Sequence, residues 1–427
     1  MKRYEQSEQH LKRAEQTIPL GSQTFSKSRT QYPVGVSPLY IDRAHGCHVW
    51  DVDGNKYIDL VSSLASVTLG YNNRKIESAV RKQLRKGVIF SLPGTLEAEV
   101  SEMICELVPS AEMVRFGKNG SDATSAAVRL ARAYTGKNKV LVCGYHGWQD
   151  WFIGSTSRNK GVPNAVSDLT QSFEFNDLES FNKAITAGDI ACVVMEPMNV
   201  NYPALGFLEE IREITQRLGI ILIFDETITG FRFTSGGAQK LFGVTPDLST
   251  FGKGLANGFP LSAVVGKREI MMEMENIFFS GTFGGELLSL SSAKEVLIKH
   301  LNNEVCHNLS DIGTTLNVIT TEAINRNGLS NVLNTSGHPT WIFLNWNPTD
   351  EYTVAQMKTY FLQECFNKGL IVLNSHNVTL AHSQKILEKI GDIYSTILGN
   401  LNKSIAIGNL DKLLKVEPLM PLFTIRK

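Results

Sequence analysis

The stretch DIACVVMEPMNVNYPALGFLEEIREITQRLGIILIFDE, residues 189–226, decides the fold class. It opens with an apolar run at 189–197, continues into a helix-like pattern at 207–219 and closes with a second apolar run at 220–226. Short apolar runs without polar alternation are typical of strands that are buried on both faces. Two such strands joined by a helix indicate a parallel pair with a helix packed on the sheet.

The same alternation extends toward the N-terminus. VRFG (114–117) precedes the helix-like SDATSAAVRLARAYTG, and KVLVCG (139–144) follows it. Repeated strand–helix units predict an open, mostly parallel, doubly wound α/β sheet that binds ligands at the carboxyl ends of its strands. After about residue 300 a smaller α/β pattern follows, with strands expected at 339–346 and 370–373. Near the N-terminus we expect a polar helix over 4–16 and, around the Asp-Gly of YIDRAHGCHVWDVDGNKYIDL, a hairpin of two strands.

Composition and charge exclude several classes of protein. Lysine plus arginine (42) equals aspartate plus glutamate (42), which gives no electrostatic case for nucleic acid or an anionic membrane. The opening MKRYEQSEQHLKRAEQ lacks an apolar signal-peptide core, and no apolar run has membrane length. The six cysteines are scattered singly and the nine histidines lack metal-ligand spacing, so we expect neither a disulfide framework nor a metal site. A cytoplasmic setting is expected.

Two segments place polar side chains at a helix start or a strand end. Gly120 and Ser121 stand directly before an alanine-rich helix, where N–H groups and a hydroxyl can bind an anion. The alternative is that Ser121 or Asp122 is only a helix cap. Asp225 and Glu226 end an apolar strand, where a carboxylate is desolvated and needs a cationic partner, and helix capping is again the alternative.

Aromatic side chains and a lysine complete the pattern. GYHGWQDWF (144–152) gathers residues that either stack on a flat ring or form a core cluster, namely Tyr145, His146, Trp148 and Trp151. FGKGLANGFP (251–260) holds Lys253 between two glycines, 28 residues after Asp225. One cofactor combines a flat ring, a phosphate, an aldehyde for lysine and a pyridine nitrogen for a carboxylate, and it is pyridoxal 5′-phosphate. We therefore predict a pyridoxal-phosphate site.

Several motifs together resemble those of class III, fold type I aminotransferases, and most of all the glutamate-1-semialdehyde aminomutase branch. They are WDVDGNKYIDL, GKNGSDATSAAVRLARAYTGK, GYHGW, FDETITGFR, FGKGLANGFPLSAVVGK, SGTFGGE and LAHS, in the family's order from about residue 38 to 383. The resemblance implies a large cofactor-binding domain at 61–300. It also implies a small α/β domain formed by the N-terminal segment 1–60 and the C-terminal segment 301–427.

The resemblance further implies a role for each matching residue. Lys253 carries the cofactor as an internal aldimine and moves a proton between Cα and C4′, so that the amino group passes through the pyridoxamine phosphate form. Asp225 keeps the pyridine nitrogen protonated, and Tyr145 stacks on the ring with His146 beside it. Thr227 contacts the ring face, at a position where the family has valine. Gly120 and Ser121 bind the phosphate. Thr282 reaches the phosphate in the neighbouring subunit of a homodimer.

Two segments depart from true aminomutases of this branch. Their IPGGVNSPVRAF-like segment seats the substrate carboxylate with a serine and an arginine, whereas IPLGSQTFSKSR has Thr24 and Lys27 there. Asn374 stands in place of a glutamate, and the stretch after GYHGW lacks the lid residues that retain the diamino intermediate. We therefore predict an aminotransferase that moves an amino group from a donor to a small carbonyl compound, a sugar or another metabolite. The intramolecular aminomutase is the alternative.

Three further residues have two open interpretations. Arg232 in GFRF either receives a substrate carboxylate or pairs with an acidic residue at the strand end. His376 and His382 either line the mouth of the pocket or take a plain core or surface position.

Overall fold

The structure is a computed structural model, and it describes residues 3–303 and 305–419. By its internal contacts the chain forms two compact units. The central unit takes Ala65–Val67 and Arg74–His307. Among the described residues, the terminal unit takes 3–64, Thr68–Asn73 and 308–419. The division into functional domains that the sequence suggests stays a prediction.

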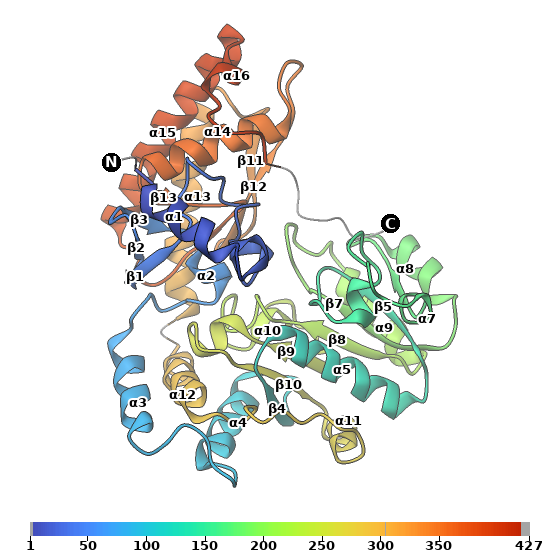
Figure 1. Ribbon diagram of the computed structural model, residues 1–427. Helices are drawn as coiled ribbons and strands as arrows, with labels where there is room; N and C mark the ends of the chain where they lie inside the picture. The colour runs from blue at the N-terminus through green and yellow to red at the C-terminus, as the bar shows by residue number, and fades with distance from the viewer. Residues whose placement is uncertain (1–2, 304, 420–427) are drawn as a thin grey trace. The chain divides into compact units, whose positions relative to one another are not determined.

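A seven-stranded sheet forms the middle of the central unit (Figure 1). Its strands, in spatial order, are β4 (Met113–Gly117), β10 (Ser262–Gly266), β9 (Leu248–Phe251), β8 (Ile221–Asp225), β7 (Ile190–Met195), β5 (Lys139–Cys143) and β6 (Thr170–Ser172). The pairs from β9 across to β6 are parallel, whereas β10 is antiparallel to both of its neighbours. The strands expected at 114–117, 139–144, 189–197 and 220–226 are β4, β5, β7 and β8. The mostly parallel α/β sheet is therefore confirmed.

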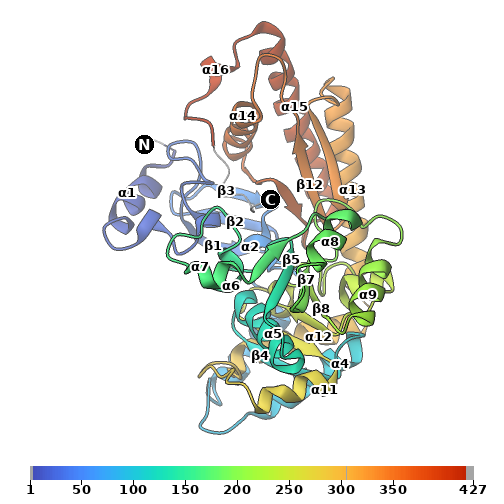
Figure 2. The same cartoon turned by 90° about the vertical axis from the view of Figure 1, so that its right-hand side faces the viewer.

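Helices cover both faces of this sheet (Figure 2). Along β7, Cys192 and Val194 belong to the core cluster of α5 (Gly120–Thr135), while Val193 and Met195 belong to that of α9 (Phe207–Arg217). Every residue of β7 is buried, as the unbroken apolar run predicts. The other helices of this unit are α3 (Arg74–Leu84), α4 (Thr95–Leu107), α6 (Asp150–Ile153), α7 (Asn164–Ser167), α8 (Leu178–Ile185), α10 (Gly237–Phe242), α11 (Arg268–Met271) and α12 (Leu287–Leu301).

Six strands end at one edge of the sheet, and five of them are followed by loops that line one cavity. Because β10 is antiparallel to both β4 and β9, β4 runs in the same direction as β9 and the other parallel strands. The loops after β4, β5, β7, β8 and β9 therefore start along the same carboxyl edge. This is the edge where doubly wound sheets bind their ligands.

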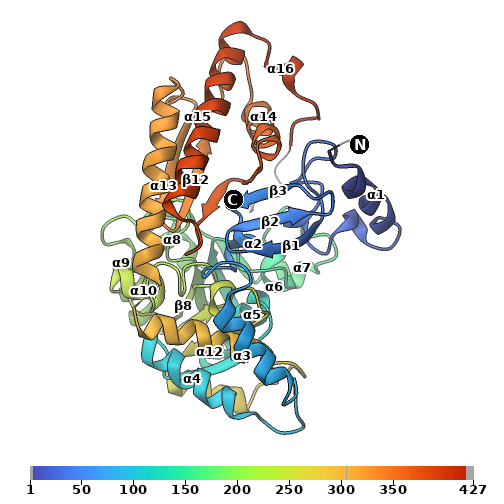
Figure 3. The same ribbon diagram turned by 90° about the vertical axis from the view of Figure 1, so that its left-hand side faces the viewer.

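The terminal unit contains a four-stranded sheet (Figure 3), in the order β1 (Ile41–His45), β2 (His48–Asp51), β3 (Lys56–Asp59) and β13 (Leu370–Ile371). β13 pairs in parallel with β3, which joins the N-terminal and C-terminal segments in one sheet. The hairpin predicted around the Asp-Gly turn is confirmed as β2 and β3, and the segment forms a third strand, β1, that the sequence did not predict. Gly46 has a φ of 59°, which lets the chain turn between β1 and β2. The Asp-Gly turn connects β2 with β3 as expected.

The remaining elements of the terminal unit follow the sequence pattern. The polar helix expected at 4–16 is α1 (Glu5–Ala14), and the strand expected at 339–346 is β12 (Trp341–Trp346). β12 lies between β11 (Leu333–His338) and β14 (Ser375–Asn377) in a separate sheet. The other elements are α2 (Ser62–Ala65), α13 (Cys306–Arg326), α14 (Val354–Asn367), α15 (Gln384–Ile407) and α16 (Leu410–Leu413). Within residues 3–303 and 305–419, no helix has the length and apolar composition needed to cross a membrane.

Candidate active site

A cavity of about 280 Å³ opens at the carboxyl edge of the central sheet. The loops after all five strands contribute to its wall. The lining residues are Asn119, Gly120, Ser121, Thr124, Tyr145, His146, Gly147, Trp148, Glu196, Asp225, Thr227, Ile228 and Lys253. Every site residue expected from the sequence lies in this wall except Thr282, which is exposed in the loop before α12.

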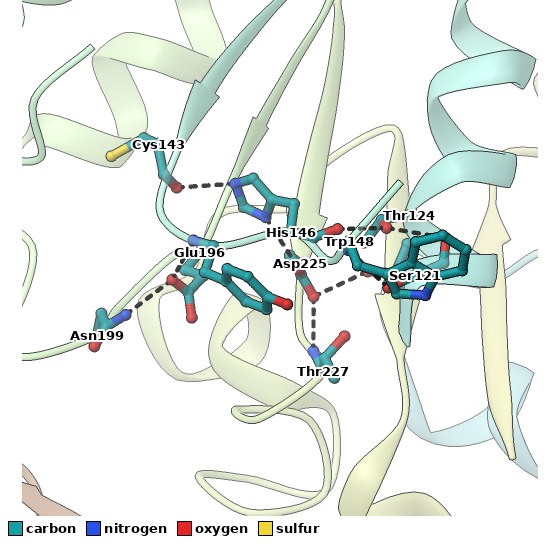
Figure 4. A network of polar contacts seen from close by, with 11 residues as sticks. Ser121, Thr124, Cys143, His146, Trp148, Glu196, Asn199, Asp225 and Thr227 are labelled. Atoms are coloured by element: carbon teal, nitrogen blue, oxygen red, sulfur yellow. Dashed lines mark hydrogen bonds and ion pairs between the residues drawn. The ribbon is translucent and has the colours of Figure 1, made fainter. Parts of the chain in front are cut away.

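Asp225, the last residue of β8, forms a buried pair with His146 (Figure 4). The His146 Nδ1 lies 2.9 Å from Asp225 Oδ2, and the His146 Nε2 lies 3.1 Å from the carbonyl oxygen of Cys143. Both of these oxygens can accept a hydrogen bond from the imidazole ring. Burial alone would raise the pKa of Asp225, but the hydrogen bond and charge attraction of His146 hold that pKa below its usual value. The structure thus keeps a charged carboxylate in a dry cavity.

Two further hydrogen bonds stabilise the charged form of Asp225. The Thr227 N–H donates to Asp225 Oδ1 at 3.1 Å, and the Thr250 hydroxyl donates to the same oxygen at 3.1 Å. Glu226, the other acid of the strand end, is different. It is fully buried and accepts the backbone N–H groups of Ala238 and Gln239, so it holds the start of α10 and does not line the cavity.

Lys253 follows β9 and begins a short 3-10 helix, η3 (Lys253–Ala256), with a φ of 37°. Burial lowers the pKa of Lys253 to about 8, while Glu196 and Asp225 act in the opposite direction. A lysine with this pKa has a much larger neutral fraction near pH 7 than an ordinary lysine, as a nucleophile or base requires. A Cβ on Gly252 would meet the Thr227 methyl at 3.4 Å, which is an ordinary van der Waals distance, whereas the φ of 97° at Gly258 favours glycine there.

The start of α5 lies in the cavity wall, and the role of Gly120 and Ser121 in anion binding stays a prediction. Asn119, and neither Ser121 nor Asp122, is the residue before the helix, and its side chain accepts the Asp122 N–H at 3.1 Å. The Ser121 hydroxyl oxygen accepts the Trp148 N–H at 3.2 Å, which leaves the hydroxyl proton for donation. Gly120 has the Thr227 side chain 3.2 Å from where its own Cβ would lie, so a larger residue would be crowded there.

The aromatic segment divides into two sets. Tyr145 and Trp148 line the cavity, and Tyr145 packs edge-on against Phe152 with ring centroids 5.5 Å apart. Trp151 is buried in the core cluster of α5, and its Nε1 donates to Ser125 Oγ at 2.9 Å. Of Tyr145, Trp148 and Trp151, only Trp151 therefore takes the core position.

Glu196 was not predicted from the sequence, although it directly follows the last residue of β7 and lies in the same cavity wall as Asp225. Its Oε2 accepts the Tyr145 N–H at 3.1 Å and the Asn199 amide at 2.8 Å (Figure 4). Burial raises the pKa of Glu196. A Cβ on Gly144 would lie 2.4 Å from Oε2, so the carboxyl group packs directly against the backbone of the aromatic segment. The signal that could have found it is the one used for Asp225, an acidic residue at the end of an apolar strand.

The residues with open interpretations lie outside this cavity. Arg232 is fully buried, its Nη2 donates to the Ala65 carbonyl at 3.0 Å, and burial lowers its pKa to about 10. In the terminal unit, the Nε2 of His376 lies 2.7 Å from the Tyr394 hydroxyl, and the Nδ1 of His382 lies 3.0 Å from the Thr379 hydroxyl. Burial lowers the pKa of His376 to about 3 and that of His382 to about 4. These contacts favour the structural alternative for the two histidines.

Three of the positions that depart from the aminomutase pattern, Thr24, Lys27 and Asn374, belong to the terminal unit. The Thr24 hydroxyl accepts the Lys27 N–H at 3.2 Å, and Lys27 lines a separate cavity of about 500 Å³ within that unit. The carbonyl of Asn374 accepts the Leu344 N–H at 2.8 Å.

Comparison with known proteins agrees with this geometry. The family model "Aminotransferase class-III" matches residues 31–384. The chain is 34% identical over 419 residues to glutamate-1-semialdehyde 2,1-aminomutase 2 of Brevibacillus brevis, covering 90% of this chain and 96% of that protein. It is 40% identical over 280 residues to 3-aminobutyryl-CoA aminotransferase of Cloacimonas acidaminovorans, covering 63% and 67%. A solved structure of the pyridoxal-phosphate internal aldimine form of the Sphingopyxis sp. MTA144 FumI protein matches with a TM-score of 0.88 at 26% identity, covering 97% of this chain and 99% of that one.

Fold and site together define a fold type I pyridoxal-phosphate transferase. The chain belongs to the class III aminotransferase family, whose members use pyridoxal phosphate. The residues present fit this cofactor. One cavity is lined by a lysine amine, a charged buried carboxylate and a serine hydroxyl at a helix start. The amine suits the aldehyde of pyridoxal phosphate, the carboxylate suits its ring nitrogen, and the hydroxyl suits its phosphate.

Proposed function

We propose that the protein transfers an amino group from an amine donor to a small carbonyl compound. The observation that carries this proposal is the presence of Lys253 and Asp225 in the wall of one cavity, beside the start of α5. Pyridoxal phosphate, when bound, supplies an aldehyde that captures amines and a ring that withdraws electrons from the substrate Cα. The protein supplies the attachment, the charges and the proton transfers.

Lys253 and Asp225 have the two catalytic roles in this proposal. Lys253 would hold the cofactor through its Nζ, and once free, with its lowered pKa, this amine would serve as the base that takes a proton from the substrate Cα and returns it. Asp225 would hold the pyridine nitrogen and keep it protonated, because the charge of this carboxylate is supported by His146. Tyr145 and Thr227 line the same cavity and would contact the ring.

The phosphate is assigned to the start of α5. The Gly120 and Ser121 N–H groups belong to the first turn of this helix, and the Ser121 hydroxyl has a proton to donate. The helix dipole adds to the attraction of an anion.

Thr282 completes this phosphate site from a second subunit, so we infer a homodimer. Several exposed apolar side chains of the central unit support a covered surface near Thr282, namely Phe90, Leu92, Phe278 and Phe283. The Leu287 N–H bonds the Val88 carbonyl at 2.9 Å, so these two loops lie together. Light scattering on the full chain should give twice the mass of 47.3 kDa. A monomer that retains the cofactor with unchanged affinity after Thr282→Ala would contradict the shared site.

Cofactor binding is assigned to the segment 61–300, flanked by 1–60 and 301–427. All residues that line the cavity at the sheet edge fall within 119–253, which supports this assignment. We also propose a cytoplasmic setting, because all six cysteines are free thiols and persistent disulfides belong to oxidising compartments.

The function is tested by a screen of amine donors with the purified, cofactor-loaded protein. A true donor should bleach the visible absorbance of the lysine-linked cofactor, and a carbonyl acceptor should restore it. Lys253→Ala should abolish this cycle. Failure of every donor to change the absorbance, with the cofactor bound, would refute the proposal.

The aminomutase is the second candidate, and its support is the long match to an aminomutase of Brevibacillus brevis. The two candidates differ in donor dependence. Net conversion of glutamate-1-semialdehyde to its amino-shifted isomer with no added amine would establish the aminomutase. We expect no such conversion, because Thr24 and Lys27 replace the carboxylate-binding pair of that branch.

A further inference from the structure

Lys118 lies between β4 and α5 and does not itself line the cavity of the candidate active site. Its Nζ donates to Glu286 Oε2 at 3.1 Å and to the Pro260 carbonyl oxygen at 3.1 Å. Its backbone N–H donates to Asp122 Oδ2 at 2.9 Å. One lysine therefore contacts the first turn of α5, the loop after η3 and the residue that precedes α12.

Glu286 is a fixed partner for the Lys118 ammonium. Its carboxylate also accepts the Leu288 N–H at 2.7 Å and the Ser289 N–H at 3.2 Å, so it caps the start of α12. Burial opposes the charge of Glu286, but hydrogen bonds from Ser289 and Lys118 hold its pKa below the usual value. The side chains of Glu286 and Lys118 are only 12% and 23% exposed, so water screens this pair less than a surface pair.

Both partners of Lys118 lead to the short helix that Lys253 begins. The Ser292 hydroxyl of α12 donates to the Ala256 carbonyl at 2.8 Å, and Ala256 is the last residue of η3. The Phe259 N–H, directly before Pro260, donates to the same carbonyl at 3.0 Å. The segments that Lys118 contacts are therefore hydrogen-bonded to the helix of Lys253.

On its other side, Lys118 is joined to the start of α5. Asp122 accepts the N–H of Lys118 at 2.9 Å and the N–H of Asn119 at 3.1 Å, which ties the residues before the helix to its first turn. Gly120 and Ser121, to which the phosphate is assigned above, belong to the same turn. Lys118 thus connects the assigned phosphate site with the helix that carries the assigned attachment lysine.

A ligand that is held at two ends requires a fixed separation between the two binding groups. Pyridoxal phosphate would use Lys253 for its aldehyde and the start of α5 for its phosphate. Binding groups keep their geometry when neighbouring residues support them, and a small displacement lowers affinity for a ligand that needs both groups at once. A ligand that needs only one of the two groups is not affected.

We propose that Lys118 is a positioning residue that sets the separation between the start of α5 and Lys253 through its contacts with Glu286 and Pro260. This inference rests on the proposed function, because that proposal assigns the phosphate to α5 and the aldehyde to Lys253. Lys118 then supports the preference of the protein for the phosphorylated cofactor over pyridoxal, which has the aldehyde without the phosphate.

The test measures dissociation constants by absorbance titration of the full-chain apoprotein with no amine donor present. The wild type should bind pyridoxal phosphate more tightly than pyridoxal. Lys118→Met should raise the dissociation constant of pyridoxal phosphate about tenfold, or about 1.4 kcal/mol, and leave that of pyridoxal unchanged. Lys294→Met is the matched control, because it removes the lysine of another ion pair of α12, with Glu99 of α4, and should change neither constant.

A second variant, Glu286→Gln, separates positioning from a direct attraction between the Lys118 ammonium and the phosphate. It removes a negative charge, so direct attraction alone predicts tighter binding of pyridoxal phosphate. Positioning predicts weaker binding, because Lys118 loses its charged partner. Combining Lys118→Met with Glu286→Gln should then cost less than the sum of the two single changes.

The binding results stand apart from turnover. If no amine is converted but Lys118→Met selectively weakens pyridoxal phosphate, the proposed function fails and the positioning role stands. If Lys118→Met weakens both ligands equally or neither, or if Glu286→Gln tightens pyridoxal phosphate, the inference is wrong.

Discussion

The replacement His146→Leu tests whether Asp225 is held charged by a buried partner. The leucine removes the donor that lies 2.9 Å from Asp225 Oδ2 and leaves a buried carboxylate with two neutral donors, the Thr227 N–H and the Thr250 hydroxyl. Breaking a buried ion pair costs about 3–5 kcal/mol, and because two donors remain we expect about 3 kcal/mol of unfolding free energy to be lost.

The loss of unfolding free energy in His146→Leu should depend on pH. In the wild type the pKa of Asp225 is lowered, so its stabilising contribution is present above the unfolded-state pKa and is lost as the pH falls through the lower folded-state pKa. In His146→Leu, burial dominates and should raise the pKa of Asp225, so protonation should relieve the penalty. The difference between the two proteins should therefore be largest near pH 7 and shrink as the pH falls toward about 4.

The assay is urea unfolding of the full chain without cofactor, followed by tryptophan fluorescence at several pH values. His10→Asn, a surface change on α1, is the control and should be neutral. Adding Asp225→Asn to His146→Leu should restore part of the loss, because the unpaired charge is then gone. A double variant no more stable than His146→Leu, at every pH, would refute the reasoning.

Two further predictions concern Glu196. Glu196→Gln keeps an acceptor for the Tyr145 N–H but removes a negative charge from the cavity, so the pKa of Lys253 should fall below about 8. The pH profile of cofactor capture by the apoprotein should therefore shift to lower pH, and an unshifted profile would contradict the effect of Glu196 on Lys253. Gly144→Ala puts a Cβ 2.4 Å from Glu196 Oε2 at a φ of 108° and should lower the free energy of unfolding by about 3 kcal/mol in thermal unfolding. The control Gly136→Ala, with a φ of 68° and open space around it, should lower it by about 1 kcal/mol. Equal losses would show that the Glu196 contact is unimportant.

The sequence predicts this fold well where a strand is an unbroken apolar run. Unbroken apolar runs such as the one that became β7 are recognisable because a strand buried on both faces needs no polar alternation. The antiparallel direction of β10 could not be predicted, because strand direction depends on how the loop after Lys253 returns to the sheet. The extra strand near Gly46 was missed because a two-residue turn interrupts a run that otherwise looks like one strand.

The site was predictable in part for a similar reason. Asp225 and Lys253 stand out because a charged residue at the end of an apolar strand, or between glycines, is conspicuous on its own. The pairing of His146 with Asp225 joins residues 79 positions apart and depends on the packing of two strand ends, which no local pattern encodes.

The central claim is that Lys253 is the residue that bonds pyridoxal phosphate. Borohydride reduction of the loaded protein, followed by proteolysis and peptide mass spectrometry, tests it directly. We predict one reduced pyridoxyl group, on the Nζ of Lys253. Its recovery on a different lysine, or on none while the cofactor is demonstrably bound, would contradict the account.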